Sequence, residues 1–413
     1  MRGWRAAAAR GDVDAMFSLA FAYDEGGDGV AADPGEAARW SARAEAAAAA
    51  ALDGFADDGS PTKWTYRADA PVAVVGVACK DDKVFVGTQR GLVAVAAATG
   101  GERWAAPGAF WKSRPLPSGD GATVFAGTRS GAFVALDAAT GGDRWRLAVG
   151  DVDSTAAASP DGRAVYFGGD DGAVRCVTAA GAELWAARTG AFVVGRPAVS
   201  RDGRAVYAGS VDSRVYAFAA RDGARRWVFD TGGPVEGGPA VSADDAVVFV
   251  GSHDGRVYAV DALDGSELWR YDAGGGSRPV GGAPALSPDG AFLYVAAHRR
   301  LVALRAADGA EVWAFETGDV VEGDPVVAGG AAYVVSRDHA LYKVDAATGA
   351  LRWANADAKW ASAPALSPGG DVLYVASRDR RLHALRVDRL DARADAQRDA
   401  AALARRFVEA EAH

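Results

Sequence analysis

A tryptophan-ended stretch recurs along most of the chain, and its spacing constrains the fold more than any other feature. One copy is V-Y-A-V-D-A-L-D-G-S-E-L-W, residues 257–269. The tryptophans that end the copies, together with one that begins the series, lie 40 to 44 residues apart: Trp64, Trp104, Trp145, Trp185, Trp227, Trp269, Trp313 and Trp353. A regular period of this length, with strand and turn signals in every unit, is typical of a repeat architecture rather than of one globular fold.

Each period is predicted to contain four short strands. Between residues 227 and 269, runs of β-branched and aromatic residues such as A-V-V-F-V-G-S and R-V-Y-A-V alternate with the polar turns A-D-D, H-D-G and D-A-L-D-G-S. The Asp-Gly turns supply the positive φ angles that tight hairpins need. One four-stranded sheet cannot bury both faces, whereas copies stacked around an axis can. The pattern therefore predicts a β-propeller.

Small residues at fixed offsets from each tryptophan indicate how neighbouring blades dock. The residue four before the tryptophan is glycine in all seven complete copies: Gly100, Gly141, Gly181, Gly223, Gly265, Gly309 and Gly349. The residue ten before it is alanine in five copies, and Arg175 and Lys343 take that position in the other two. We expect each indole to lie on backbone that carries no large side chain, and the contacts at Arg175 and Lys343 to be packed differently.

The ends of the ring are expected to exchange strands. The first tryptophan strand, residues 63–66, precedes any complete blade, and the eighth blade has no tryptophan strand of its own. Pairing of residues 63–66 with His383–Val387 would complete eight blades and leave no open sheet edge. This gives a mainly β fold, an eight-bladed β-propeller over residues 63–388.

Two copies of the repeat carry a family resemblance. The stretches A-L-D-A-A-T-G-G-D-R-W (135–145) and K-V-D-A-A-T-G-A-L-R-W (343–353) resemble the A-x-D-x-x-T-G-x-x-x-W signature of the pyrroloquinoline-quinone-type repeat. The resemblance covers residues 64 to about 388. It implies an eight-bladed propeller of the kind found in quinoprotein dehydrogenases and in non-catalytic propellers similar to the lipoprotein of the bacterial outer-membrane assembly machine. Because the repeat serves enzymes and binding proteins alike, it leaves the function open.

The two ends of the chain have helical rather than alternating patterns. Residues 1–52 are rich in alanine and are similar to one SEL-like repeat, a relative of the tetratricopeptide repeat that forms an α-hairpin. Asp33 is expected to cap its second helix, with Pro34 at the first helical position and Glu36 completing a capping box. Residues 53–62 form a polar linker, and residues 389–413 are predicted to form a C-terminal helix that docks on the N-terminal helices.

Bulk properties exclude several classes of partner. The net charge of −9, without a basic run, argues against nucleic acid. Two cysteines form no disulfide framework, and no stretch approaches 18 uncharged apolar residues, so insertion into a membrane is not expected. The first residues lack the apolar segment of a secretory signal. We therefore expect a soluble, cytoplasmic monomer with a protein partner.

Candidate binding residues come from the strand nearest the axis. Three residues before its proline, or at the equivalent place, the blades carry Lys112, Asp153, Val194, Glu236, Gly281, Glu322 and Ala361. Glu236 and Glu322 could bind a cation or a basic peptide at the channel mouth, or could be solvated or hydrogen-bonded strand ends. Trp111 and Trp360 fall outside the tryptophan register, and could be exposed stacking platforms for a ligand or could cover the channel.

No constellation of catalytic residues can be recognised. The quinone enzymes use a calcium ion, a catalytic aspartate and often two adjacent cysteines; this sequence has no adjacent pair, and no cofactor is expected. His253, His298 and His339 occupy different register positions, which disfavours a shared metal site. The favoured function is a non-enzymatic protein-binding scaffold; a quinone-dependent oxidoreductase and a ligand-sensing propeller are the alternatives.

Overall fold

A computed structural model describes residues 33, 35, 36, 39, 40 and 43, and then 61–68, 72–110, 112–274, 279–356, 358–360 and 362–390. Contacts divide the chain into two units, Met1–Ser60 and Pro61–His413. No helix among these described residues is long and apolar enough to cross a membrane. The second unit carries the repeats.

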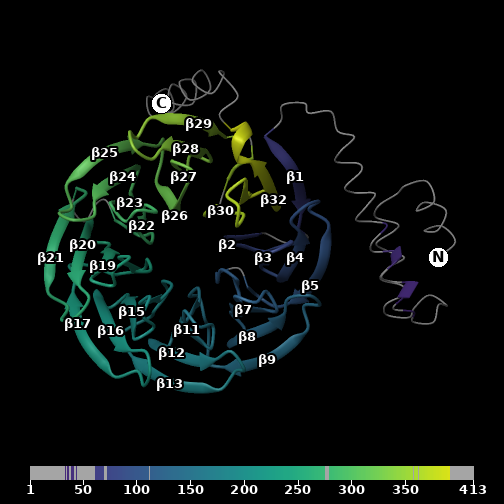
Figure 1. Ribbon diagram of the computed structural model, residues 1–413, viewed down its shortest axis with the longest axis horizontal. Helices are drawn as coiled ribbons and strands as arrows, with labels where there is room; N and C mark the ends of the chain where they lie inside the picture. Colours follow the sequence, from purple (N-terminus) through teal and green to yellow (C-terminus); the bar gives the residue numbers. More distant parts are fainter. Residues whose placement is uncertain are drawn as a thin grey trace, which may run out of the picture. The chain divides into compact units, whose positions relative to one another are not determined.

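The described part of the second unit forms eight four-stranded antiparallel sheets arranged as the blades of a ring (Figure 1). Blades 1 to 4 contain β2 (Val72–Lys80), β3 (Lys83–Thr88), β4 (Gly91–Ala96) and β5 (Glu102–Pro107); β6 (Leu116–Pro117), β7 (Thr123–Gly127), β8 (Ala132–Asp137) and β9 (Asp143–Ala148); β10 (Ala157–Ala158), β11 (Ala164–Gly168), β12 (Ala173–Thr178) and β13 (Glu183–Arg188); and β14 (Ala198–Val199), β15 (Ala205–Ser210), β16 (Arg214–Ala219) and β17 (Arg225–Asp230).

Blades 5 to 7 contain β18 (Ala240–Val241), β19 (Val247–Gly251), β20 (Arg256–Asp261) and β21 (Glu267–Asp272); β22 (Ala285–Leu286), β23 (Phe292–Ala297), β24 (Arg300–Arg305) and β25 (Glu311–Glu316); and β26 (Val321–Ala328), β27 (Ala331–Ser336), β28 (Leu341–Asp345) and β29 (Leu351–Asn355). In each blade the strands run outward in chain order, so that the first strand lies nearest the axis (Figure 1).

The eighth blade joins the two ends of the ring, as expected. It contains β30 (Ala365–Leu366), β31 (Val372–Ala376) and β32 (Arg381–Arg386), and its outer strand is β1 (Thr62–Arg67) from the start of the unit. The register pairs Trp64 with Ala384 and Arg67 with Arg381, two residues earlier in β32 than the predicted pairing with His383–Val387. A short 3₁₀ helix, η1 (Val387–Arg389), follows β32.

The hydrophobic core lies between successive blades. One cluster, for example, joins Tyr207 and Trp227 of blade 4 to Val248 and Tyr258 of blade 5, all of them buried. Each blade therefore buries its two faces against its two neighbours, which is why the isolated unit could not be stable.

The tryptophans and the glycines of the repeat meet across these contacts. A methyl group on Gly265 of blade 5 would lie 2.8 Å from Cδ2 of Trp227 of blade 4, and the six other repeat glycines approach the tryptophan of the preceding blade in the same way. The indole N–H of Trp227 donates a hydrogen bond of 3.0 Å to the carbonyl of Ala262. Seven of the eight tryptophans make the equivalent bond to the following blade: Trp64, Trp104, Trp145, Trp185, Trp227, Trp269 and Trp313.

Two details differ from what the spacing from each tryptophan predicts. The repeat alanine faces the tryptophan of its own blade, as Ala217 faces Trp227, rather than the neighbour's. In blade 3 the residue opposite Trp185 is Cys176, not Arg175, because the turn between β12 and β13 is one residue shorter. Lys343 does lie opposite Trp353, and its Nζ donates to the carbonyl of Val387 at 3.3 Å.

The helical segments lie almost entirely outside the described residues. Gly35, Glu36, Arg39, Trp40 and Arg43 are helical, and the Asp33 carboxylate accepts hydrogen bonds from the backbone N–H groups of Gly35 (3.0 Å) and Glu36 (3.1 Å). This is the geometry of an N-cap. The rest of the SEL-like hairpin and the C-terminal helix at 389–413, apart from Arg389 and Leu390, stay predictions.

Candidate functional site

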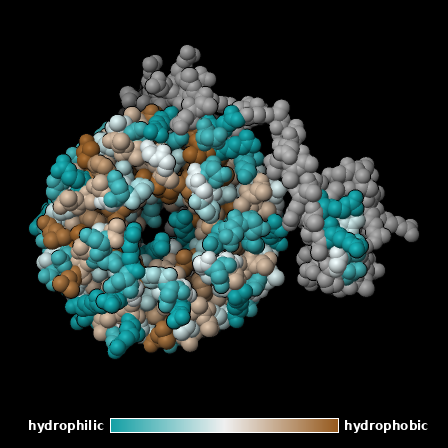
Figure 2. Space-filling view, viewed as in Figure 1, coloured by the Kyte–Doolittle hydropathy of each residue, from teal (hydrophilic) through white to brown (hydrophobic). Residues whose placement is uncertain are grey.

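The central channel is lined by the innermost strands and by the residues that lead into them. Figure 2 shows an opening at the centre of the ring with hydrophilic residues beside it. The cavity there has a volume of about 430 Å³, and its walls include four of the repeat prolines: Pro197, Pro239, Pro284 and Pro325. Most of the wall is alanine, valine and proline, so the few charged side chains in it stand out.

Glycines let successive blades approach closely at one level of the channel. A methyl group on Gly195 would lie 2.7 Å from the carbonyl carbon of Gly237, and one on Gly237 would lie 2.6 Å from the carbonyl oxygen of Gly282. A methyl group on Gly282 would likewise lie 2.7 Å from the oxygen of Gly323. Side chains at these positions would collide with backbone, so this part of the ring requires glycine.

Three blades carry a charged residue between this close-approach position and the proline of the innermost strand: Arg114, Arg196 and Asp324. Arg114 Nε donates to the carbonyl of Val77 at 2.7 Å, and Asp324 Oδ1 accepts the backbone N–H of Ala283 at 2.6 Å. Arg196 makes no hydrogen bond or ion pair with the described residues, and it is exposed in the cavity wall. Burial raises the pKa of Asp324 above its ordinary value, and the two arginines oppose that rise. Two guanidinium groups facing one carboxylate can accommodate an oxyanion.

Beside blades 2 and 3, the channel mouth carries a group of paired charges. Asp153 receives two hydrogen bonds from Arg129, 2.9 Å from Nε to Oδ1 and 2.7 Å from Nη2 to Oδ2, and Lys112 Nζ lies 3.5 Å from Oδ2. Burial acts to raise the pKa of Asp153, but the hydrogen bonds from Arg129 and the charge of Lys112 outweigh it and hold the pKa below its ordinary value. Asp153 is therefore a charged, fixed part of the rim.

The two glutamates singled out from the sequence have different surroundings. Glu322 is only 13% exposed, with its Oε1 2.9 Å from Arg337 Nε and 3.5 Å from Arg378 Nη2. These two arginines agree with the alternative that Glu322 is a hydrogen-bonded strand end, and binding of a cation or a basic peptide by Glu322 stays a prediction. Glu236 is 47% exposed, and its nearest ion-pair partner is His253 Nε2 at 3.6 Å. Glu236 therefore keeps a carboxylate that a ligand can reach.

The two tryptophans outside the register do not form the expected pair of platforms. Trp111 lies outside the described residues. Trp360 is 3% exposed, donates its indole N–H to the carbonyl of Asn355 at 2.8 Å, and packs edge-on against His383. Because its faces are covered, Trp360 is not an exposed stacking surface, and that interpretation is wrong.

The donor groups do not match a quinone and calcium site. Among the described residues, no group of three or more His, Cys, Asp or Glu side chains is placed to hold a metal ion. Cys79 and Cys176 lie in different blades, and burial raises the pKa of each thiol to about 11. The channel arginines could bind carboxylates of a quinone, but Asp324 is the one carboxylate beside them in the cavity wall and cannot alone supply a calcium shell.

Sequence reasoning missed Arg114, Arg196 and Asp324, three of the four charged residues in the cavity wall. It examined the position three before the proline and not the position one before it, where most blades carry small or neutral residues and Arg114, Arg196 and Asp324 are the departures. A search for residues that depart from the repeat at channel-lining positions would have found them.

The fold and the tryptophan-docked blades define a propeller of the pyrroloquinoline-quinone-repeat class. A family model described as outer membrane protein assembly factor BamB matches residues 89–160, 151–278 and 253–411, and the chain belongs to that family. A crystal structure of BamB from Moraxella catarrhalis is 20% identical, with a TM-score of 0.63, and the match covers 79% of this chain and 97% of that one. The computationally designed protein Ika8 is 15% identical, with a TM-score of 0.68 and coverage of 79% and 100%. No curated protein matches.

Proposed function

We propose that this protein is a non-enzymatic scaffold that binds another protein through the face of the ring at the channel mouth. Membership of a family described by an assembly factor supports a protein-binding role. The absence of a matching metal-ligand set among the described residues gives no support to the oxidoreductase alternative.

The observation that carries the proposal is an exposed aromatic side chain on a braced loop. Phe192 lies in the loop between β13 and β14, which also carries the channel-lining residues Arg196 and Pro197. Its side chain is 53% exposed, although phenylalanine is normally buried. Its loop is held by three bonds: Gly190 N–H to Asp212 Oδ2 (2.7 Å), Thr189 Oγ1 to the carbonyl of Ala191 (2.7 Å), and Ser210 Oγ to the same carbonyl (3.1 Å). A rigid, exposed aromatic ring is the type of residue that dominates protein interfaces, since little conformational entropy is lost on binding.

Photo-crosslinking tests this assignment. A photoreactive phenylalanine analogue is placed at position 192, or as a control at position 263, where Leu263 is 84% exposed on a turn of blade 5. Each full-length variant is expressed in the native host, irradiated, and the adducts are identified by mass spectrometry. We expect a defined protein adduct from position 192 that position 263 does not give. Equal adducts at both positions, or none at 192, would refute this face as the interface.

A further inference from the structure

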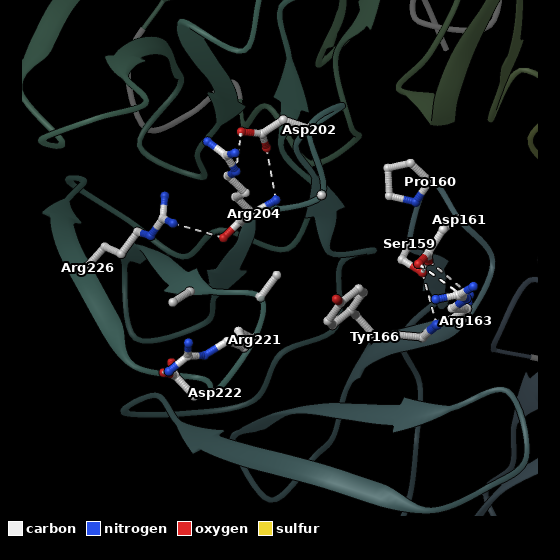
Figure 3. Close-up of a pocket in the computed structure, with 14 residues that line it drawn as sticks. Ser159, Pro160, Asp161, Arg163, Tyr166, Asp202, Arg204, Arg221, Asp222 and Arg226 are labelled. Carbon is white, nitrogen blue, oxygen red and sulfur yellow. Dashed lines mark hydrogen bonds and ion pairs between the residues drawn. The ribbon is translucent and has the colours of Figure 1, made fainter.

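A second pocket lies away from the channel, at the seam between blades 3 and 4, and has a volume of about 570 Å³. Its walls are the turns that follow β10 and β14, the turn between β16 and β17, and parts of β11 and β17. Figure 3 shows four arginines around it: Arg163, Arg204, Arg221 and Arg226. We name it the seam pocket.

Two of these arginines replace an alanine of the repeat. In six of the eight blades the turn after the innermost strand begins with a serine. Four residues later, blades 2, 5 and 6 carry Ala122, Ala246 and Ala291, and blade 8 carries Asp371. Blades 3 and 4 carry Arg163 and Arg204 at that position. Arginine takes this position only in two adjacent blades, and the other blades with this serine form the same turn without it, so its presence there requires another explanation.

Arg221 is a third departure of the same kind. It lies two residues before the turn glycine, Gly223, and the corresponding residue is alanine in five of the six other blades with that glycine: Ala98, Ala139, Ala179, Ala307 and Ala347. Its side chain is 92% exposed, and its guanidinium lies 3.6 Å from Asp222.

The fourth change removes a negative charge. Arg144 and Arg352 precede the tryptophans of blades 2 and 7 and are paired with Asp137 and Asp345, four residues before the turn glycine. In blade 4 that aspartate is replaced by Ala219, so Arg226 lacks this partner and instead donates to the carbonyl of Arg204 at 2.9 Å. All four departures thus move the charge at one seam in the positive direction, in a chain of net charge −9.

The fold itself gains little from these arginines. The side chains of Arg163 and Arg204 are 88% and 81% exposed, and they lie 3.9 Å and 3.8 Å from Asp161 and Asp202. These separations are longer than a direct charge-assisted hydrogen bond, and exposed pairs of this kind contribute little stability. The aspartates are already engaged in their own turns, as Asp161 is by Ser159 Oγ at 2.6 Å. The guanidinium groups therefore remain available to a ligand.

We propose that the seam pocket binds an acidic peptide segment of a partner protein, whose carboxylates pair with Arg163, Arg204 and Arg221. This rests on the scaffold function proposed above and adds a second contact surface to it. A peptide suits the pocket better than a concentrated polyanion does, because three aspartates lie among the arginines: Asp161, Asp202 and Asp222. Spaced carboxylates can reach the guanidinium groups, while the peptide's N–H groups donate to the aspartates.

The test uses the full-length protein and a fluorescein-labelled peptide of three glutamates separated by glycines, followed by fluorescence polarisation. The triple variant R163A/R204A/R221A introduces the alanine that several other blades carry at these positions, so the fold should be preserved. The control R214A/R270A/R305A removes three exposed arginines elsewhere, with the same change in net charge. We expect the seam variant to lose at least tenfold in affinity and the control less than twofold. The affinity of the wild type should also fall with salt more steeply than that of the seam variant.

A second variant tests the site without removing an arginine. Ala219→Asp should capture Arg226, as Asp137 captures Arg144, and should weaken peptide binding severalfold while leaving the thermal midpoint unchanged or higher. Equal binding by the wild type and the seam variant, an equal loss in the control, or no binding by the wild type would overturn the proposal. Displacement of the peptide by millimolar inorganic phosphate would also overturn it, in favour of a simple oxyanion site. None of these results depends on Phe192, so the two proposals fail separately.

Discussion

The native protein should become less stable as the pH falls below 6.5, and replacement of His383 should abolish the part of this pH dependence that the histidine causes. His383 lies on β32, between β31 and the exchanged strand β1, where it pairs with Val375 and Thr65. Its Nδ1 is 3.3 Å from Thr65 Oγ1 and its Nε2 is 3.2 Å from Ser377 Oγ. Ser377 donates its own proton to Asp379, so it accepts from Nε2–H and the imidazole is held neutral.

The size of the effect follows from the pKa. Burial lowers the pKa of His383 from 6.5 to about 4; the charge of Asp379 opposes this, and that of Arg381 adds to it. The unfolded chain takes up the proton near pH 6.5 and the folded chain near pH 4, so stability is complete above 6.5 and falls as the pH drops to 4. The full loss is about 3 kcal/mol, and about 2 kcal/mol of it occurs by pH 5.

Other blades carry a tyrosine at the position of His383, which makes tyrosine the most suitable replacement. The residue at this register position is Tyr216, Tyr258 or Tyr342 in blades 4, 5 and 7, where its hydroxyl donates to the aspartate four residues earlier, as Tyr342 does to Asp338 at 2.6 Å. His383→Tyr should therefore pair with Asp379 and should not titrate in this range. His383→Gln serves as a second variant if the larger ring disturbs Trp360.

Urea unfolding at pH 7.5 and pH 5, followed by tryptophan fluorescence, measures the difference. With a slope of about 3 kcal/mol per molar urea, the wild type should lose about 0.7 M more in its midpoint than either variant does. Carboxylates that titrate in the same range are common to all three proteins and cancel in the comparison. Equal shifts in wild type and variants would refute the reasoning, as would a directly measured pKa of His383 near 6.5.

Four further predictions concern the blades, the thiols, the cofactor and the ends. Gly265 has a φ of 79°, and the methyl group of Gly265→Ala would lie 2.8 Å from Trp227, so this variant should lower the free energy of unfolding by about 3 kcal/mol. Gly290 has a φ of 72° with nothing within 4 Å, so Gly290→Ala should lower it by only about 1 kcal/mol. The urea midpoints of the two variants measure the difference. Cys79 and Cys176, whose pKa burial raises to about 11, should resist iodoacetamide at pH 8 and react only after unfolding, as mass spectrometry would show. Dye-linked alcohol or sugar oxidation should not appear when pyrroloquinoline quinone and calcium are added, and quinone-dependent turnover would contradict the scaffold function. Residues 395–408 should exchange amide hydrogens more slowly in the full chain than in a chain lacking residues 1–52, because the terminal helices are predicted to dock.

The repeat period was sufficient to predict the number of blades and their closure. Eight tryptophans with an unpaired first strand leave one arrangement without an open edge, and β1 does complete the sheet of β30, β31 and β32. The pairing lies two residues earlier in β32 than expected, because β1 and β32 come from opposite ends of the unit and the repeat spacing does not fix the register between them. The same limit applies to Arg175: a turn one residue shorter displaced it from the position that spacing from Trp185 assigned to it.

The charged sites were harder to predict, because a carboxylate in a strand gives no indication of its partners. Glu236 and Glu322 occupy the same position in blades 5 and 7, yet Glu322 is clamped by Arg337 and Arg378, which come from other turns of blades 7 and 8. The sequence likewise allowed Trp360 to be an exposed aromatic residue, whereas the structure buries it against His383. Pairing of this kind depends on which turns the ring brings together, and the period alone does not specify side chains at those turns.

In a repeat protein, departures from the repeat are more informative about function than the repeat itself. The tryptophan and glycine positions recur because every pair of blades needs the same contact, so they carry no information about a ligand. Arg196 in the channel and Arg163, Arg204 and Arg221 at the seam interrupt that regularity, and the contacts of the described residues give them little structural role. Unpaired or loosely paired guanidinium groups in a protein of net charge −9 are costly unless solvent or a ligand satisfies them. Arg196 lies in the loop that presents Phe192, and the seam arginines lie in turns at the opposite ends of the strands of blades 3 and 4. This sector of the ring is therefore the place where binding should be sought first.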